Sequence, residues 1–309
     1  MVQVFIDGKE GTTGLRIFDR LAGRKDIALL TLKEEQRKER SARKEMLNSC
    51  DIAFLCLPDA AAQEAVALIE NERTRVIDAS TAHRTLPGWQ YGFPELFENG
   101  FAKVKNAPRV AVPGCHASGF IALIYPLIQA GFLEKDALLT CHSLTGYSGG
   151  GKKMIAEYEA DKRSRLLDAP RQYGITQQHK HLKEMQAVCG LQNAPVFCPI
   201  VAPFYSGMLV TVPLFAKQPK KGGIEDIRRL YAARYGGPLV RYSENSDEAG
   251  FLSSNARQGS DAMEISVFGN EERLLLTARY DNLGKGASGA AIECMNIMLG
   301  CDPLTGLEI

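Results

Sequence analysis

The chain has 309 residues, with 37 Lys plus Arg against 36 Asp plus Glu, so its net charge is close to zero. This length allows one large or two medium domains with a substantial core. The balanced charge provides no overall field that would attract nucleic acid or an anionic membrane. The composition therefore favours small-molecule chemistry and predicts neither a nucleic-acid nor a membrane partner.

Eight cysteines are spread through apolar surroundings without a C-x-x-C pair. This spacing indicates neither a zinc site nor a thioredoxin-like motif, and it is typical of reduced, intracellular thiols. No basic and apolar leader precedes the strand-like run that begins at Val2, and the longest apolar stretch, 120–128, is interrupted by Pro126. We therefore expect a soluble, cytoplasmic protein with no metal.

The first predicted element is a strand over Val2–Asp7, followed by a glycine-rich turn and an apolar helical pattern. Gly8, Gly11 and Gly14 form a G-x-x-G-x-x-G spacing in that turn. A strand, a glycine turn and a helix are what a Rossmann phosphate site needs. Because the spacing differs from G-x-G-x-x-G, a plain strand-to-helix turn is the alternative.

Four more apolar runs alternate with helical or polar segments, at Asp26–Leu32, Asp51–Leu57, Arg75–Asp78 and Arg109–Val112. This alternation predicts a parallel sheet.

The second apolar run carries a cofactor signal at its end. An NAD-binding fold would place an acidic residue at this position to bind the ribose 2′-hydroxyl, but this chain has Leu32 and Lys33. The basic residues Arg37, Lys38 and Arg40 follow. NADP is therefore favoured over NAD. The alternative for most of the charged segment from Lys33 to Glu45 is a solvated helix.

Strand ends in such a sheet line the ligand crevice. Pro58 ends one strand, and Asp59 is expected to cap an Ala-rich helix over residues 60–70. Arg84 follows another strand end and could hold a carboxylate or phosphate bidentately. A lone arginine is, however, more often a surface ion-pair partner.

Cys115 is the candidate nucleophile. It follows a β-branched run and a Pro-Gly turn, just ahead of apolar residues spaced as one face of a helix over 120–128. A helix N-terminus stabilises a nearby anion by only about 0.3–1 kcal/mol, so a reactive thiolate needs a histidine or another cation as well. The alternative is a small buried residue in a tight turn.

The remainder of the chain predicts a second domain. A strand over 137–143 leads into Gly146–Lys153, expected to be a flexible loop whose two lysines cradle a phosphate or act as a lid. Strands are predicted over 195–204, 208–215, 239–242, 263–268 and 273–280, the last two as a hairpin, with one helix over 224–234. The expected result is a mostly antiparallel sheet with helices on one side.

Several stretches together carry a family resemblance. They are Gly8–Gly14, Val76–Ser80, Tyr91–Glu95, Pro113–Cys115, Ser143–Gly149, His179–His181 and Asn282–Ala287 with Met295–Asn296. In that order they resemble the signature stretches of the N-acetyl-γ-glutamyl-phosphate reductases, which are NADP-dependent enzymes of arginine biosynthesis, and the match spans nearly the whole chain. Departures at Gly11–Gly14 and at Gly149–Lys152 indicate the shorter branch of the family.

The resemblance implies a Rossmann domain followed by an α+β catalytic domain, as in aspartate-semialdehyde and glyceraldehyde-3-phosphate dehydrogenases. We expect residues 1–114, rejoined by a C-terminal helix over 286–309, to bind NADP. Residues 115–285 are expected to provide catalysis and to form a homodimer or homotetramer.

The implied chemistry begins with attack of the Cys115 thiolate on an acyl phosphate. Phosphate leaves, a thioester forms, and hydride from NADPH converts it to the aldehyde. Backbone N–H groups at 116–118 would face the oxyanion, and His179 or His181 would support the thiolate and move protons. An extended chain would point these two rings to opposite sides. Glu184 could orient one of them or lie on the exposed face of its helix.

The candidate site residues fall into three groups. The catalytic residues are Cys115, His179, His181 and Glu184; the cofactor ligands are Gly8, Gly11, Thr12, Thr13, Gly14, Lys33, Pro58 and Ser80; the substrate and phosphate ligands are Arg84, Ser118, Ser148, Gly149 and Lys152.

Three alternatives are compatible with parts of this pattern. One is another acyl-phosphate or semialdehyde dehydrogenase, acting on aspartate semialdehyde or on a carrier-bound substrate. A second is a nucleotide-binding sensor without catalysis, which Cys115 and the histidine pair argue against. A third is a cysteine acyltransferase or hydrolase, which would give the glycine turn no purpose.

Overall fold

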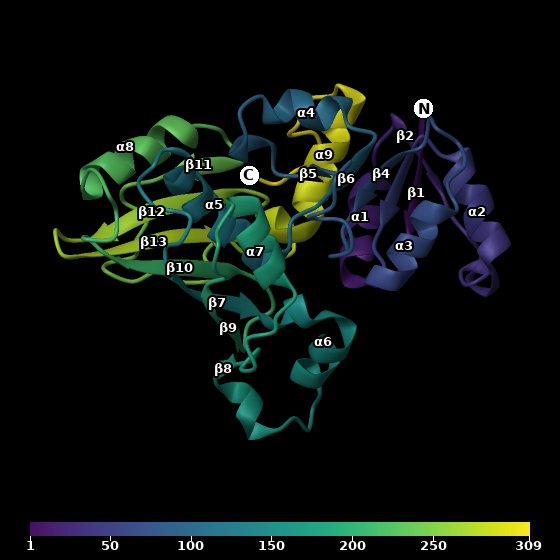
Figure 1. Cartoon of the computed structure of the whole chain (residues 1–309). Coiled ribbons are helices and arrows are strands. Elements are labelled where there is room, and N and C mark those ends of the chain that lie inside the picture. Colours follow the sequence, from purple (N-terminus) through teal and green to yellow (C-terminus); the bar gives the residue numbers. More distant parts are fainter. The chain divides into compact units, whose positions relative to one another are not determined.

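The computed structural model describes all residues, 1–309. The chain forms two compact units (Figure 1): unit 1 contains residues 1–113 and 287–307, and unit 2 contains 114–286 and 308–309. The last two residues belong to unit 2, where the Glu308 N–H donates to Asp261 Oδ2 at 2.9 Å. None of the helices combines the length and apolar character needed to cross a membrane.

Unit 1 contains a six-stranded sheet in the order β2-β1-β3-β4-β6-β5, and every pairing in it is parallel. The predicted parallel sheet is therefore confirmed. Its strands are β1 (Val2–Asp7), β2 (Ile27–Leu30), β3 (Ile52–Leu55), β4 (Arg75–Asp78), β5 (Gln90–Tyr91) and β6 (Arg109–Ala111).

Helices cover both faces of this sheet, because its alternate side chains enter two separate cores. One core joins the sheet to α1 and α9, and the other joins it to α2 and α3. The helices of unit 1 are α1 (Thr12–Leu21), α2 (Arg40–Ser49), α3 (Asp59–Ala67), α4 (Gly100–Asn106) and α9 (Gly289–Leu299), with short turns η1 (Glu34–Gln36) and η2 (Pro94–Leu96). This is a doubly wound Rossmann arrangement.

Unit 2 contains a seven-stranded sheet in the order β11-β12-β13-β10-β7-β9-β8. The pairings β7·β9 and β11·β12 are parallel and the others are antiparallel. The predicted hairpin is confirmed in β12 and β13, which pair from Met263 with Tyr280 to Gly269 with Leu274. The strands are β7 (Thr140–Gly146), β8 (Arg171–Gln172), β9 (Val196–Ala202), β10 (Met208–Phe215), β11 (Val240–Tyr242), β12 (Met263–Gly269) and β13 (Arg273–Tyr280).

The helices of unit 2 are α5 (Cys115–Gln129), α6 (Gly151–Glu159), α7 (His181–Cys189) and α8 (Ile224–Arg234), with turns η3 (Tyr147–Gly150), η4 (Arg165–Asp168) and η5 (Gly284–Ser288), whose last two residues lie in unit 1. Helix α5 packs on β10 and β13 and is buried on almost every side, rather than on the single face that its apolar spacing predicted. Pro126 is accommodated inside it.

Two local expectations are wrong. Residues 147–153 are helical, in η3 and the start of α6, because Tyr147 and Ser148 N–H groups donate to the carbonyls of Phe204 and Tyr205 and the Tyr147 ring stacks on Tyr158. Asp59 does not cap α3. It is the first residue of that helix, and its carboxylate accepts hydrogen bonds from the backbone and hydroxyl of Thr81.

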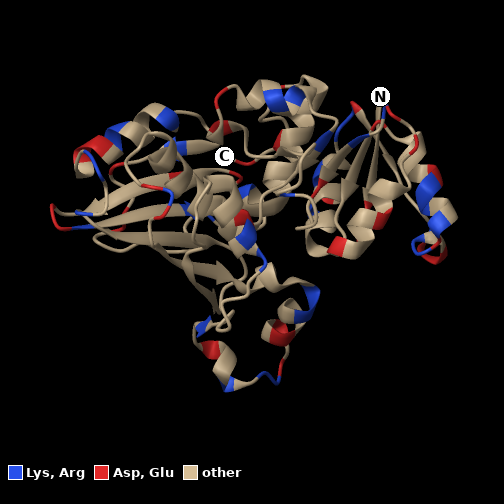
Figure 2. Cartoon of the chain, viewed as in Figure 1, with Lys and Arg blue, Asp and Glu red and all other residues tan.

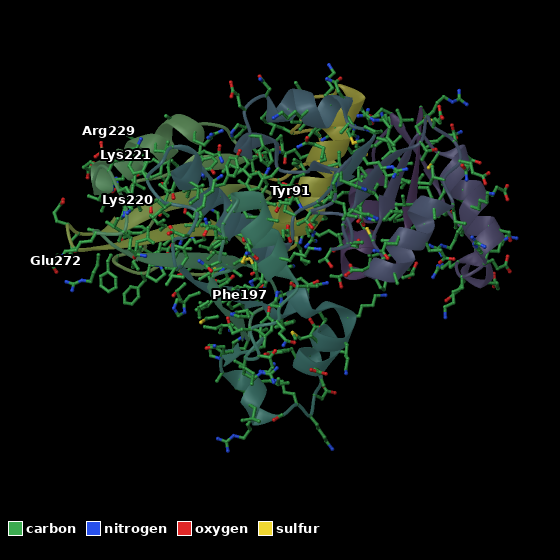
Figure 3. All side chains as sticks on the ribbon, in the orientation of Figure 1. Tyr91, Phe197, Lys220, Lys221, Arg229 and Glu272 are labelled. Atoms are coloured by element: carbon green, nitrogen blue, oxygen red, sulfur yellow. The ribbon has the colours of Figure 1, made fainter.

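Acidic and basic residues are interspersed on the helices of both units (Figure 2). Strands β7, β9 and β10 carry no Lys, Arg, Asp or Glu. The charged side chains Lys220, Lys221 and Arg229 lie at the α8 end of unit 2, away from Phe197 on β9 (Figure 3).

Candidate active site

The turn between β1 and α1 has the backbone of a phosphate cradle. Gly8 has φ +85°, and a Cβ there would lie 2.3 Å from the Cys56 carbonyl oxygen; a Cβ on Gly14 would lie 2.5 Å from Gly8 O. Helix α1 begins at Thr12 with no side-chain cap, so the first-turn N–H groups are left for a ligand. The buried Thr12 Oγ1 has no hydrogen-bond partner. These features fit a dinucleotide phosphate.

A cavity of about 370 Å³ opens beside this turn, between the ends of β1 and β2. Arg37 and Lys38 line it, whereas Lys33 is exposed and outside its lining. Asp7 also lines the cavity and pairs with Arg43 at 2.9 Å. Burial raises the pKa of Asp7, although Arg43 opposes that effect. The structure thus brings two of the three basic residues that follow the Lys33 position to the candidate nucleotide cavity.

The end of β4 is organised by a fully buried carboxylate. Asp78 accepts hydrogen bonds from the Ser80 N–H and hydroxyl, at 2.9 and 2.7 Å, and its Oδ2 lies 2.6 Å from His83 Nδ1. The His83 ring stacks on Trp89 with centroids 4.1 Å apart. Ser80 is therefore held in place at this strand end.

Arg84 and Pro58 occupy neighbouring strand ends. The Arg84 guanidinium donates to Val112 O at 2.8 Å and to Ala79 O at 3.1 Å, so it joins the ends of β4 and β6. It is buried rather than a surface ion-pair partner. Pro58 is the residue before the first turn of α3.

In unit 2, Cys115 is the first residue of α5 and is half-buried. Tyr280 donates its hydroxyl to Cys115 O at 2.5 Å and accepts from the Gly119 N–H at 3.0 Å, which clamps the first turn of the helix. A Cβ on Gly286 would lie 3.2 Å from Cys115 Cβ, so only glycine allows this approach without displacement. The backbone of Cys115 is therefore held by the Tyr280 hydroxyl, and its Cβ lies close to the Gly286 backbone.

The first turn of α5 also supplies backbone donors. The Ser118 N–H donates to Gly114 O at 2.8 Å, as in a regular helix, and the Ser118 hydroxyl donates to the same oxygen at 3.0 Å. The N–H groups of His116 and Ala117 precede this first intrahelical bond. Because the Ser118 N–H is already bonded, the set of oxyanion donors expected at 116–118 is reduced to 116 and 117.

The histidine pair lies on one side of the chain. Lys180 adopts a helical conformation and α7 begins at His181, so the two rings approach to 4.7 Å between centroids. The opposite orientation that an extended chain would give is not adopted, because Lys180 between them is helical. His179 Nδ1 accepts the His181 N–H at 3.2 Å, and burial lowers the pKa of His179.

Glu184 is buried, 2% exposed, and its Oε1 accepts the Gly114 N–H at 2.9 Å. The alternative of an exposed position is therefore wrong. His181 and Glu184 are separated by three residues along α7, a spacing that places them on one face. Glu184 thus joins the histidine-bearing helix to the residue before Cys115.

Two residues at this site were not predicted from the sequence. His116 follows Cys115 and is buried, with Nδ1 2.6 Å from Ser143 Oγ and Nε2 2.6 Å from Tyr173 Oη. Burial lowers the pKa of His116 to about 3 and raises that of Tyr173. The position of a histidine next to the nucleophile was the available signal for His116. Nothing in the local sequence around Tyr173 indicated its role.

The remaining predicted ligands lie near the end of β7. Ser148 is buried and its hydroxyl accepts a hydrogen bond from Asn282 Nδ2 at 3.0 Å. Gly149 is exposed beside Thr145 and Asn282, and Lys152 is exposed in the first turn of α6. The structure contains no group of three or more His, Cys, Asp or Glu side chains that could hold a metal ion.

Family models match both parts of the chain. Residues 30–104 match the semialdehyde dehydrogenase NAD binding domain, and residues 115–282 match the semialdehyde dehydrogenase dimerisation domain. Aspartate semialdehyde dehydrogenase II from Vibrio cholerae covers 97% of this chain and 99% of its own, with a TM-score of 0.71 and 15% identity. The Candida albicans aspartate semialdehyde dehydrogenase with NADP gives a TM-score of 0.67, at 14% identity, over 97% and 98%. The chain thus has the two-domain fold of the semialdehyde dehydrogenases.

Closer relatives define the family. The N-acetyl-gamma-glutamyl-phosphate reductase of Rhizobium meliloti is 45% identical over 96% of this chain and 98% of its own. N-acetyl-gamma-glutamyl-phosphate reductase 2 of a Nostoc species is 42% identical over 99% of both chains. The chain belongs to the N-acetyl-gamma-glutamyl-phosphate reductase family, which confirms the resemblance. It is an oxidoreductase that uses a nicotinamide dinucleotide and forms an oligomer.

Proposed function

We propose that this protein reduces N-acetyl-γ-glutamyl phosphate to N-acetylglutamate 5-semialdehyde in arginine biosynthesis, through a thioester on Cys115. The observation that carries the proposal is the position of Cys115 as the first residue of buried helix α5, where the N–H groups of His116 and Ala117 precede the first intrahelical hydrogen bond.

The thioester step uses groups of unit 2. Cys115 Sγ attacks the acyl carbon and the C–O bond to phosphate breaks, so that phosphate leaves. The N–H groups of His116 and Ala117 stabilise the oxyanion, a contribution worth roughly 10²–10³ in rate for one such donor. When bound, NADPH supplies the hydride that reduces the thioester.

We assign proton transfer to His181. Burial favours the neutral form of His179, and its Nδ1 already accepts the His181 N–H, so His179 holds its neighbour in place. His181 begins α7 and shares a helix face with the Glu184 carboxylate. Its ring can then take the proton of the Cys115 thiol and return a proton when the thiolate leaves.

For the cofactor we propose NADP rather than NAD. The pyrophosphate of NADP would be held by the turn between β1 and α1, through Gly8, Gly11, Thr12, Thr13 and Gly14. The remainder of the cofactor would contact Pro58 and Ser80, which follow β3 and β4. Arg37 and Lys38 line the cavity and are the cations available to a 2′-phosphate, with Lys33 a further candidate. No acid follows β2 directly.

For the substrate, we keep Gly149 and Lys152 as phosphate ligands because both are exposed at the end of β7. Ser118, Ser148 and Arg84 would each have to share or exchange a hydrogen bond that they already make within the protein. Their part in substrate binding is therefore proposed as secondary.

We propose that the oligomer is a homodimer formed through the open face of the unit 2 sheet. Side chains of β10 alternate between buried and partly exposed, and Leu209, Thr211 and Pro213 lie on the partly exposed face, which continues to Phe215. Val196, on β9, is 56% exposed. On β7, β9 and β10 this face carries no Lys, Arg, Asp or Glu and combines aliphatic side chains with Thr140, His142 and Thr211, which fits the low charge typical of an interface core.

One assay tests the function directly. Phosphate-dependent NADP reduction is measured with N-acetylglutamate semialdehyde and, in parallel, with aspartate semialdehyde. A kcat/KM at least about 100-fold higher for the acetylated substrate, or ~2.7 kcal/mol of discrimination, is expected. A preference for aspartate semialdehyde, or turnover without phosphate, would contradict the proposal.

A further inference from the structure

The ring of His116 is the contact point between three parts of unit 2. It belongs to α5, its Nδ1 meets Ser143 Oγ on β7, and its Nε2 meets Tyr173 Oη in the segment before α7. A neutral imidazole has one N–H donor and one acceptor nitrogen. One hydroxyl therefore donates to the ring and the other accepts from it, and both ring nitrogens are satisfied.

The same ring also supports the histidine pair. Its centroid lies 5.8 Å from that of His179 and 5.7 Å from that of His181. Phe197 closes the remaining side, 5.4 Å from His116 and 5.2 Å from His179. These ring contacts mean that the candidate proton-transfer residues pack directly on the side chain next to the nucleophile.

The segment that carries Tyr173 and the histidines, residues 173–181, has little regular structure before α7 begins. Hydrogen bonds also connect it to β9, from the Tyr173 N–H to Pro199 O and between Gln177 and Phe197 in both directions. The hydrogen bond between the Tyr173 hydroxyl and His116 therefore connects this segment to α5, the helix that begins with the nucleophile.

We propose that His116 is the positioning residue of this site, holding Tyr173 and the histidine pair at the first turn of α5. The proposal rests on the proposed thiol chemistry. Its chemical basis is the double hydrogen bond. A phenylalanine would fill the same space but leave the Ser143 and Tyr173 hydroxyls without their partner, and a buried hydroxyl deprived of its partner is costly.

Neutrality is the second requirement of this role. His116 lies against two other histidines, and a positive charge on it would oppose the protonation of either one. Burial lowers its pKa to about 3, so His116 is uncharged at neutral pH. The protons exchanged at the site then belong to the pair and not to the ring that holds it.

The test compares His116→Phe, Tyr173→Phe and the double variant with the parent protein. The two readouts are the pH profile of Cys115 alkylation and the imidazole NMR signals of His179 and His181, which are assignable because the chain has five histidines. We expect each single variant to move the alkylation midpoint upward by about one pH unit and to shift both histidine signals. The double variant should add nothing to His116→Phe, because that change already removes the hydrogen bond that Tyr173→Phe removes.

Two additional variants separate positioning from general stability. Tyr231→Phe removes another buried tyrosine hydroxyl bond to α5, the one to Leu123 O, and should lower stability without moving the profile or the signals. His116→Gln, which retains an amide near the Nε2 position, should restore the Tyr173 contact and most of the parent profile. If His116→Phe does not fold, His116→Gln alone and combined with Tyr173→Phe provides the same comparison.

Kinetics completes the experiment. His116→Phe should lower kcat by roughly 10–100-fold and leave the KM for NADP unchanged. Histidine signals and an alkylation profile identical to the parent in both single variants, or additive effects in the double variant, would overturn the role of His116. An inactive parent protein whose variants still show these coupled shifts would refute the proposed function and leave the positioning role intact.

Discussion

The carboxylate of Glu184 accepts the backbone N–H of Gly114 at 2.9 Å, which ties α7 to the residue that precedes Cys115. Both groups are buried. The N–H of Gly114 is one that the helix itself cannot satisfy, and a charged acceptor makes this bond stronger than a neutral one. One side chain therefore links the histidine-bearing helix to the nucleophile helix.

We expect Glu184→Gln to lower activity only, whereas Glu184→Ala should lower both activity and stability. The glutamine can still accept from Gly114 but lacks the negative charge on the His181 face of α7, so it should fold normally and lose about tenfold or more in kcat. The alanine leaves a buried N–H unpaired and should also cost ~1–3 kcal/mol of stability. Urea unfolding followed by circular dichroism, together with turnover, measures both. Equal stability of the two variants would show that the Gly114 bond contributes little.

Replacement of Cys115 by serine separates a nucleophile from a packed thiol. The serine keeps the volume but has no thiolate and no strong base to activate its hydroxyl. Cys115→Ser should fold, bind NADP nearly normally and lose at least about three decades of turnover, roughly 4 kcal/mol of barrier. Cys141, Cys189 and Cys294 are buried and are expected to be dispensable for chemistry. Mass spectrometry after mixing with acyl phosphate alone should locate the acyl adduct on Cys115; an adduct elsewhere would contradict the mechanism.

The two histidines should respond differently to asparagine. The lowered pKa of His179 keeps it neutral at pH 7. The free energy of unfolding therefore falls as the pH drops below ~6.5, because His179 is protonated in the unfolded chain at a higher pH than in the folded protein. His181→Asn should shift Cys115 alkylation to higher pH, whereas His179→Asn should mainly raise the substrate KM. Parent-like alkylation profiles in both variants and in the double variant would remove the pair from thiol activation.

Cofactor choice can be examined residue by residue. Arg37→Ala and Lys38→Ala should each weaken NADP binding by about tenfold or more, since a hydrogen bond to a charged group contributes ~1.5–3 kcal/mol, and should leave NAD binding little changed. Lys33→Ala tests the residue outside the cavity lining, and Lys44→Ala, on the exposed side of α2 with Glu70 as partner, is the matched control. Fluorescence titration of both nucleotides gives the constants. Equal affinity of the parent protein for NADP and NAD would reject the assignment.

The proposed dimer face predicts the effect of a charge on β10. Leu209→Arg places a cation in the centre of the apolar sheet face without entering the core, because Leu209 is on the partly exposed side of its strand. The variant should sediment as a monomer at concentrations where the parent is a dimer. Phe101→Arg, at an exposed position of α4, should not change the assembly. A dimeric Leu209→Arg variant would place the interface elsewhere.

Local sequence determined the framework. The strand Val2–Asp7, the glycine turn and the helix that follows, and the strand Arg75–Asp78 were readable because apolar period and turn residues act over a few neighbours. The same reasons place Cys115 at a helix start, since a Pro-Gly turn precedes an apolar run. Family resemblance then identified the histidine pair and the nucleotide turn.

Tertiary structure decided how those residues meet. His116 and Tyr173 are 57 residues apart in the sequence, and Gly114 and Glu184 are 70 residues apart. No local sequence pattern therefore predicts either hydrogen bond. The histidines face one side because the chain becomes helical at Lys180. Residues 147–153 are helical because the β9–β10 connection, at Phe204 and Tyr205, binds the N–H groups of Tyr147 and Ser148. The sequence predicted Arg84 as a binding residue. In the structure, its guanidinium donates to two backbone carbonyls, those of Val112 and Ala79, near strand ends. Sequence periodicity reports which face of an element is apolar; which buried polar groups satisfy one another depends on packing between distant segments.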